Sequence, residues 1–256
     1  MTILDTVLKH PIAHRGLHDR EKGVIENSKT AFQNAMEAGY GIECDLQLSG
    51  DGVPMVFHDP ELDRLTKQTG KLCTLSAGQI GRVVLTGSKP KNTPQSFAQL
   101  LEQVDGKVPL VVELKLQDNA RNPQLANAAV AVAKDYQGPI AFKSFYPSIL
   151  ASVKAAGFLG PIGIIITEIT KQSDHYNELT ALERTIVHNL LHYPQSRFDF
   201  ISADYNSLGL PAIRLLRKFG FPVMTWTVSS FEIEQKTRGH ADQLVFENYL
   251  PFRAQD

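Results

Sequence analysis

The sequence has few cysteines, no long apolar run and no excess of charge of one sign. Cys44 and Cys73 are the two cysteines among 256 residues and do not form a CxxC pair, so neither a disulfide framework nor a zinc site is expected. The apolar runs are strand-sized, far below the roughly 20 residues that cross a bilayer, and residues 1–11 do not resemble a signal peptide. We therefore expect a soluble, cytoplasmic protein without stable membrane insertion.

The charges of the chain nearly cancel. With 26 basic and 27 acidic residues, the formal net charge is -1. Nucleic acids and anionic bilayers attract proteins through broad basic fields, so we expect no nucleic-acid partner, and any phosphate chemistry must be local. A chain of this length can form one large domain or two small ones. Because no linker or repeat divides it, we expect one catalytic domain over residues 1–256, and its oligomeric state stays open.

Short apolar runs alternate with amphipathic segments along the chain. The expected strands are Pro11–Gly16, Gly41–Ser49, Pro109–Lys115, Ile140–Phe145, Ile162–Thr167, Phe198–Asp204, Pro222–Val228 and Gln243–Phe246. The expected helices are Ser28–Ala38, Gln95–Val104, Leu125–Tyr136, Ser148–Ala156, Asp174–Leu191, Leu210–Phe219 and Phe231–Thr237. Several strands are continuous apolar runs, as parallel strands covered on both faces should be. This α/β pattern predicts a (β/α)8 TIM barrel, with an open doubly wound sheet as the alternative.

The alternation breaks once, after the second strand. Ser49-Gly50-Asp51-Gly52 is a strong turn signal, and Val53–His58 is predicted to be a strand that returns beside the second one. The following segment, 59–93, is polar and has no convincing helical stripe. We therefore expect a small insertion at about residues 50–93 that runs over one end of the barrel, and long excursions of this kind are usually functional.

Acidic residues recur with the period of a strand in two of the predicted strands. Glu43 and Asp45 are two residues apart and share a face of the sheet, and Glu113 and Lys115 repeat this spacing on the next barrel strand. Two bare carboxylates about 4 Å apart would repel by roughly 4 kcal/mol at an effective dielectric constant near 20. A bound cation would remove this repulsion, and so would a Lys or Arg partner. If a cation is bound, an all-oxygen ligand set favours Mg²⁺ or Ca²⁺ over zinc.

Two histidines lie at predicted strand ends. His14 and Arg15 end the first strand, on the side where barrel enzymes place their active sites, although a buried structural histidine would give the same pattern. His58 ends the return strand. Cleavage of a phosphodiester needs one group to accept a proton and another to donate one, each worth ~10²–10⁴ in rate. Histidine suits both tasks because it titrates near neutrality.

A set of short motifs resembles the glycerophosphodiester phosphodiesterase family in order and approximate spacing. These motifs are His14-Arg15-Gly16, Glu26-Asn27-Ser28, Glu43-Cys44-Asp45, His58-Asp59-Pro60 and Glu113-Leu114-Lys115. The later segments that are also similar are Lys143-Ser144-Phe145, Thr225-Trp226-Thr227-Val228 and Ala241-Asp242-Gln243-Leu244. The resemblance covers nearly the whole chain, from Pro11 to about Pro251.

The resemblance implies the roles of a metal-dependent hydrolase. Glu43, Asp45 and Glu113 would hold one divalent cation, Mg²⁺ or Ca²⁺, that polarises the phosphate oxygens. His14 and His58 would be the general acid–base pair. In this family a neighbouring glycerol hydroxyl of the substrate is thought to attack phosphorus, and water then opens the cyclic phosphate. The substrate would be a small glycerophosphodiester, and the products would be sn-glycerol 3-phosphate and an alcohol.

The resemblance also implies contacts with the substrate. Arg15 and Lys115 would neutralise phosphate charge, Arg15 through a bidentate fork. Glu26 and Asn27 would shape the site from the first βα loop, and Asn27 is also a plausible N-cap for the helix that follows.

Two aromatic residues and two departures from the family pattern bear on the leaving group. Phe145 and Trp226 lie on strands, where they either pack in the core or line the substrate site near the barrel mouth. Ser229 stands where the family has Asn after Trp-Thr-Val, and Glu247 lies where the usual Thr-Asp-x-Pro is altered. These changes affect the barrel rim, so they bear on the preference for the leaving group rather than on the reaction class.

Three functions are compatible with these residues. The first is hydrolysis of soluble glycerophosphodiesters such as glycerophosphocholine or glycerophosphoethanolamine. The second is lysophospholipase D-type or another phosphodiesterase activity, which a bulkier apolar wall near the mouth would favour. The third is a barrel that binds a phosphoester without turnover, which would need neither His14 nor His58.

One further histidine pair invites a metal interpretation. His188 and His192 are four apart on a predicted helix and could share a face, but Asn189 stands where an HExxH motif has glutamate. We expect this pair to pack or to face solvent, away from the barrel mouth.

Overall fold

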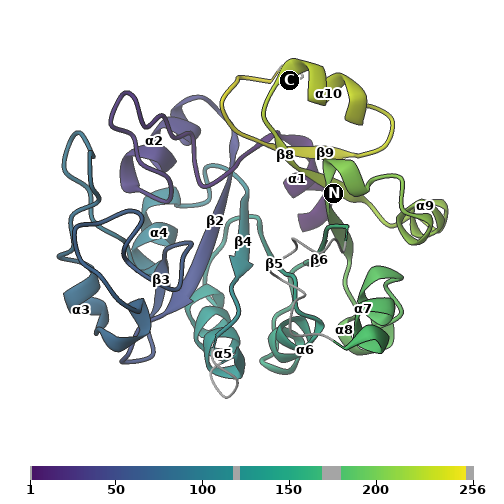
Figure 1. The fold of residues 1–256 in the computed structure, drawn as a ribbon, viewed down its shortest axis with the longest axis horizontal. Helices are drawn as coiled ribbons and strands as arrows, with labels where there is room; N and C mark the ends of the chain where they lie inside the picture. Colours follow the sequence, from purple (N-terminus) through teal and green to yellow (C-terminus); the bar gives the residue numbers. More distant parts are fainter. Residues whose placement is uncertain (1, 118–121, 169–179, 252–256) are drawn as a thin grey trace.

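The computed structural model describes residues 2–117, 122–168 and 180–251, and in them eight parallel strands close into a barrel (Figure 1). The barrel strands are β1 Ile12–Ala13, β2 Gly41–Leu48, β4 Leu110–Leu114, β5 Ile140–Ser144, β6 Ile162–Ile166, β7 Phe200–Asp204, β8 Val223–Val228 and β9 Gln243–Phe246. Their order follows the chain, and the pairing of β1 with both β2 and β9 closes the ring. The (β/α)8 prediction is therefore confirmed, and the open-sheet alternative is wrong.

Helices surround the ring of strands (Figure 1). They are α1 Ile3–Lys9, α2 Lys29–Glu37, α3 Ala77–Ile80, α4 Phe97–Val104, α5 Asn122–Ala133, α6 Pro147–Ala155, α7 Ala181–His188, α8 Tyr193–Ser196, α9 Pro211–Lys218 and α10 Phe231–Thr237. The predicted helix Asp174–Leu191 is observed as α7, and residues 174–179 lie outside the described residues. None of the described helices combines the length and the apolar character that a membrane span requires.

The strands place alternate side chains on opposite faces of the barrel wall. In β2, Cys44 and Leu46 lie in the large core between strands and helices. In β4, Val111 belongs to a second cluster that fills the barrel interior. Glu43 and Asp45 alternate with Cys44, so they face the interior, whereas Cys44 points away from them as the strand period predicts.

A short N-terminal helix packs against the interior cluster, and the sequence did not predict it. Val7 of α1 is fully buried and contacts the interior cluster, which includes Ile12, Phe200 and Met224. A capping box begins the helix, in which the Thr2 side chain accepts a hydrogen bond from the Asp5 amide. Helix α1 therefore covers apolar side chains inside the barrel, and the polar interior residues lie toward the other end of the strands.

The excursion after β2 has a small core of its own. Strand β3 Pro54–Val56 pairs antiparallel with β2, which confirms the predicted return strand. The segment contains η1 Leu72–Thr74 and helix α3, although no helical stripe was expected there. Figure 1 shows it beside α2 and α4. The buried side chains of its core are Ile25, Met55, Phe57, Leu62, Leu65, Leu72, Ile80 and Leu85.

Candidate active site

Three buried carboxylates gather inside the barrel on adjacent strands. Glu43 and Asp45 come from β2 and Glu113 from β4, where Asp45 and Glu113 are register partners. One oxygen from each lies within 4.8 Å of the others. The sequence placed these residues on one face, and the structure brings them together.

Two lysines balance much of this negative charge. The Lys115 ammonium lies 2.9 Å from Oδ1 of Asp45 and 2.6 Å from Oε1 of Glu113. The Lys143 ammonium lies 3.0 Å from Oε1 of Glu43. Burial alone would raise the pKa of the Asp45 carboxyl, but the neighbouring cations, Lys115 first, lower it well below its usual range. Lysine partners, the alternative to a bound cation as the means of removing the repulsion between the carboxylates, are thus present.

The carboxylate cluster also fits a divalent cation. Oε1 of Glu43 and Oδ1 of Asp45 are buried, and each faces a lysine ammonium, at 3.0 Å and 2.9 Å. Carboxylate oxygens held next to a cation in this way can also bind a divalent ion, which takes 6–8 oxygen ligands. Glu43, Asp45 and Glu113 together offer the carboxylate donors that Mg²⁺ and Ca²⁺ prefer.

The loop after β1 places Arg15 and Asn27 over the carboxylates. The backbone amide of Arg15 donates to Oε2 of Glu43 at 3.0 Å, and the Asn27 side chain donates to Oδ2 of Asp45 at 2.8 Å. Both residues adopt positive φ, 55° and 53°, which Asn tolerates better than most residues. The N-cap of α2 is Ser28, whose hydroxyl accepts from the Ala31 amide. The predicted capping role of Asn27 is therefore wrong, because its side chain is committed to Asp45.

Each of the two candidate histidines has a carboxylate at Nδ1. His14 Nδ1 lies 2.7 Å from Oε2 of Glu247, and His58 Nδ1 lies 2.6 Å from Oδ1 of Asp59. These contacts orient both rings and leave Nε2 as the second nitrogen of each. Both imidazoles lie near the carboxylate cluster, and a positive charge on either would lower the pKa of the Asp45 carboxyl.

Glu247 is a site residue that the sequence marked only as a departure. It follows β9, and the hydrogen bond from His14 together with the nearby His18 imidazole lowers the pKa of its carboxyl far below the ordinary value. His18 Nε2 lies 3.8 Å from the same oxygen. The signal that could have identified Glu247 is its place at the carboxyl end of the last strand, next to β1 in a closed barrel.

Lys143 and Arg64 were also missed. Lys143 is the register partner of Glu113 and lies two residues beyond Ala141, which faces the barrel interior. The strand period could therefore have placed Lys143 inside with the carboxylates. Arg64 lies in the excursion and donates to Glu26, and no local pattern relates two residues 38 positions apart.

Phe145 and Trp226 form an apolar wall near the carboxyl ends of β5 and β8. Their rings meet edge to face with centroids 5.7 Å apart, and Ile165 and Val187 pack in the same cluster. Phe145 is buried, whereas Trp226 is partly exposed and donates through its indole nitrogen to the Ser202 carbonyl at 3.0 Å. Phe145 therefore belongs to the packing of this wall, and Trp226 keeps an accessible edge.

His188 and His192 belong to two separate helices. Helix α7 ends at His188, and His192 is the N-cap of the separate helix α8. His192 is buried, and its Nδ1 lies 2.9 Å from the Ser196 hydroxyl. Burial lowers the pKa of the His192 imidazole to about 4. The expected packing role thus describes His192.

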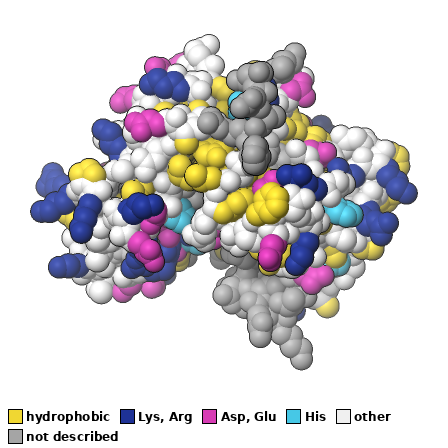
Figure 2. All heavy atoms as spheres, turned by 90° about the horizontal axis from the view of Figure 1, so that it is seen from above, with side chains coloured by type: hydrophobic (Ala, Val, Ile, Leu, Met, Phe, Trp, Pro, Cys, Tyr) yellow, Lys and Arg dark blue, Asp and Glu magenta, His cyan; other side chains and the backbone are white. Residues whose placement is uncertain are grey.

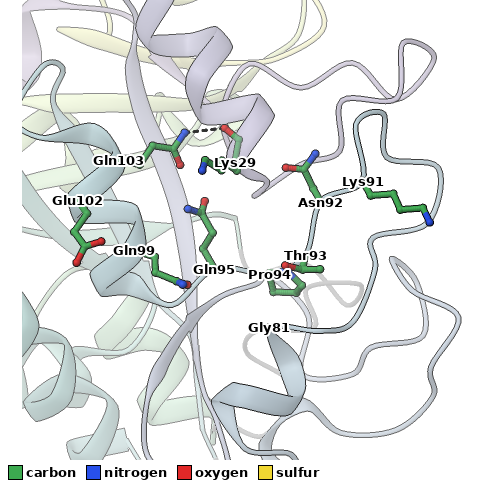
Figure 3. A pocket seen from close by; sticks show the side chains of 10 residues that line it. All are labelled: Lys29, Gly81, Lys91, Asn92, Thr93, Pro94, Gln95, Gln99, Glu102 and Gln103. Atoms are coloured by element: carbon green, nitrogen blue, oxygen red, sulfur yellow. Dashed lines mark hydrogen bonds between the residues drawn. The ribbon is translucent and has the colours of Figure 1, made fainter.

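A separate pocket of about 540 Å³ opens between α2, α4 and the end of the excursion (Figure 3). Figure 3 shows polar side chains around it, and Gln103 donates to the Lys29 carbonyl at 2.8 Å. The lining residues are Lys29, Gly81, Lys91, Asn92, Thr93, Pro94, Gln95, Gln99, Glu102 and Gln103. None of them belongs to the cluster of carboxylates, lysines and histidines inside the barrel.

The fold and this cluster define a class of protein: a (β/α)8 barrel with carboxylates, lysines and histidines gathered inside the barrel. The model of the Glycerophosphoryl diester phosphodiesterase family matches residues 14–241. The chain therefore belongs to this family and is a hydrolase of phosphoric diesters.

Relatives and solved structures agree with this placement. The chain is 27% identical over 259 residues to glycerophosphodiester phosphodiesterase 1 of Bos taurus, covering 90% of this chain and 74% of that protein. A phosphodiesterase from Oleispira antarctica, solved in complex with the product sn-glycerol-3-phosphate, is similar with a TM-score of 0.78 at 20% identity, over 97% of this chain and 96% of that one. The glycerophosphodiester phosphodiesterase of Thermotoga maritima has a TM-score of 0.68 at 23% identity over 92% of each chain. These structures confirm the fold.

Proposed function

We propose that this enzyme hydrolyses glycerophosphodiesters to sn-glycerol 3-phosphate and an alcohol, with His14 and His58 as the acid–base pair. The observation that carries the proposal is the pairing of each histidine with a carboxylate, at 2.7 Å and 2.6 Å, beside a cluster of three buried carboxylates. The Oleispira antarctica neighbour, which holds sn-glycerol-3-phosphate, supports this product for a barrel of the same fold.

The basic residues would bind the substrate phosphate. Lys115 and Arg15 lie around Asp45, at 2.9 Å and 3.5 Å from its carboxylate oxygens, and would attract the phosphodiester anion. Glu43, Asp45 and Glu113 would hold one cation, Mg²⁺ or Ca²⁺, which when bound stabilises charge on the phosphate oxygens. The lysines keep the site close to electrical balance, so the three carboxylates are not left without cations between turnovers.

The histidines would move the protons. One imidazole accepts the proton of the glycerol hydroxyl that attacks phosphorus, and the other donates a proton to the oxygen of the leaving alcohol. Water then opens the resulting cyclic phosphate with the two roles reversed. Glu247 and Asp59 hold Nδ1 of His14 and His58, so each ring presents Nε2 to the substrate. A barrel that only binds phosphoesters would have no use for two histidines oriented in this way.

The apolar wall makes a second substrate class a candidate. The accessible edge of Trp226 beside Phe145 offers apolar surface to the alcohol, and Phe231, which follows β8, has 57% of its surface exposed. A lysophospholipid would bury its acyl chain on such a surface. Soluble glycerophosphodiesters remain the first choice, because charged groups gather beyond the apolar cluster, toward the carboxyl ends of the barrel strands.

Thiol and surface chemistry support the proposed location and partners. Cys44 and Cys73 are free thiols, which supports a reducing cytoplasm. On the face shown in Figure 2, basic and acidic side chains are interspersed without a continuous basic field, which supports a small-molecule substrate rather than a nucleic acid.

The test is release of sn-glycerol 3-phosphate from glycerophosphocholine and glycerophosphoethanolamine, with and without EDTA. We expect release that EDTA abolishes and that Mg²⁺ or Ca²⁺ restores. His14→Ala should lower turnover by ~10²-fold or more without weakening cation binding, while His240→Ala, which changes an exposed histidine, should leave it unchanged. Glu43→Ala should weaken cation binding instead. Wild-type turnover in His14→Ala would contradict the acid–base assignment, and release from lysophospholipids alone would favour the second substrate class.

A further inference from the structure

A continuous chain of ion pairs joins one candidate histidine to the phosphate-binding arginine. His58 Nδ1 contacts Asp59 at 2.6 Å, and Arg64 Nε contacts the other Asp59 oxygen at 2.6 Å. Arg64 then contacts Glu26 through both terminal nitrogens, at 2.7 Å and 2.8 Å. Glu26 in turn accepts from Arg15 at 2.7 Å. Every link in this chain is close enough for a charge-assisted hydrogen bond.

Arg64 is the central link of this chain, because it binds carboxylates from two separate segments. Glu26 comes from the loop after β1, and Asp59 comes from the excursion after β3. The planar guanidinium has donors along two edges, and here one edge faces Glu26 while the other faces Asp59. A lysine ammonium could not bind both carboxylates with the same fixed geometry.

The charges alternate along the chain, so each group stabilises its neighbours. Burial would raise the pKa of the Glu26 carboxyl, but the hydrogen bonds and charges of Arg64 and Arg15 lower it to about 2. Burial likewise opposes ionisation of Asp59, whereas His58 and Arg64 lower its pKa. Without Arg64, the carboxylates of Glu26 and Asp59 would lose their shared cation.

We infer that Arg64 is a positioning residue that holds His58, through Asp59, and Arg15, through Glu26, in one fixed arrangement around the substrate. The inference rests on the proposed function, since it says how the acid–base group His58 and the phosphate-binding group Arg15 are held in fixed positions relative to each other. Misplacing a reacting group by about 1 Å can cost ~10²-fold in rate. Loss of Arg64 therefore acts on two steps, on kcat through His58 and on KM through Arg15.

The experiment compares Arg64→Gln, Arg64→Lys and the matched control Arg82→Gln, which changes an exposed arginine of the same excursion. With glycerophosphocholine we expect Arg64→Gln to lower kcat by ~10- to 10²-fold and to raise KM several-fold. Arg64→Lys should reverse part of the increase in KM but little of the decrease in kcat. Arg82→Gln should match the wild type.

Two double-mutant cycles separate positioning from general destabilisation. If Arg64 acts through Asp59, Arg64→Gln combined with Asp59→Asn should lower kcat no further than the more severe single variant. Arg64→Gln combined with Glu26→Gln should likewise raise KM no further than the more severe of the two single variants. Fully additive losses, or wild-type kcat and KM in Arg64→Gln, would overturn the inference.

A direct binding measurement keeps the inference apart from the proposed function. Calorimetric titration with sn-glycerol 3-phosphate should show several-fold weaker binding to Arg64→Gln than to Arg82→Gln. If the wild type released no product from any phosphodiester, the proposed function would fail, yet this binding difference would still support the positioning role. Equal binding by both variants would overturn it. If Arg64→Gln does not fold, Arg64→Lys gives the same comparison.

Discussion

Replacement of Lys143 by methionine tests the electrostatic balance of the site. The Lys143 side chain is buried, and its ammonium lies 3.0 Å from Oε1 of the fully buried Glu43. At this distance and an effective dielectric constant near 20, the attraction between unit charges is roughly 5 kcal/mol. Removing one partner of a buried pair typically costs about 3–5 kcal/mol, because the other charge stays buried and uncompensated. We expect Lys143→Met to lose stability in this range.

The assay is urea unfolding in EDTA, with Lys154→Met as the matched control. Lys154 lies 3.4 Å from Asp199, and both side chains are more than a third exposed, so this variant should lose at most about 1 kcal/mol. Lys143→Met combined with Glu43→Gln should regain much of the lost stability, because no charge is then left buried without a partner. Mg²⁺ or Ca²⁺ should stabilise Lys143→Met more than the wild type.

Two results would refute this reasoning. If Lys143→Met were no less stable than Lys154→Met in EDTA, the charge of Glu43 would not depend on Lys143. If the double variant were as unstable as Lys143→Met alone, the loss would reflect packing rather than an uncompensated carboxylate.

Three further predictions concern single side chains. Glu247→Gln removes the charge behind His14, and we expect kcat to fall by ~10- to 10²-fold with little change in KM. The pKa of His192 is lowered from an ordinary 6.5 to about 4. As the pH falls below 6.5, the unfolded chain therefore takes up a proton before the folded protein does. The free energy of unfolding that is present above pH 6.5 then falls by up to roughly 3 kcal/mol as the pH approaches 4. His192→Gln should therefore show a smaller loss of unfolding free energy over this pH range. Gly163→Ala should cost about 1–3 kcal/mol, because its Cβ would lie 2.3 Å from the buried ring of Phe200.

Each of these predictions has a control and a contradicting outcome. Glu232→Gln changes an exposed glutamate of α10, and equal kinetics for it and Glu247→Gln would remove Glu247 from the site. Parallel pH profiles of unfolding for wild type and His192→Gln would show that His192 does not stay neutral in the fold. Gly78→Ala meets nothing within 4 Å, so a comparable loss in this variant would contradict the steric argument for Gly163.

The barrel and its carboxylate cluster could be predicted because strand periodicity is local. Continuous apolar runs identify the strands, and the two-residue spacing of Glu43 and Asp45 is enough to place both side chains on one face. The interior direction of that face was not decided by the sequence. It follows from the inward direction of Val111, the register partner of Glu43 on β4, and of Ala141, the register partner of Val111 on β5.

The residues missed by the sequence owe their place to contacts between distant segments. Arg64 reaches Glu26 across 38 positions, and Glu247 reaches His14 across 233. Helix α1 was missed for a related reason, since its seven residues are stabilised by packing on the barrel interior rather than by a long amphipathic pattern. Local sequence patterns carry no information on these long-range contacts, because the contacts depend on how the barrel closes.

The closing seam of the barrel has a consequence for the timing of activity during synthesis. Strand β1 pairs with β9 through Ile12 and Val245, and the His14 amide donates to the Phe246 carbonyl at 2.8 Å. Contacts of such long sequence separation form late, after local structure. A ribosome-bound chain that has not yet exposed its last strand therefore lacks the partner that orients His14. With His14 in its proposed catalytic role, we expect no turnover from the nascent protein until β1 and β9 pair, so that the appearance of turnover would report closure of the ring.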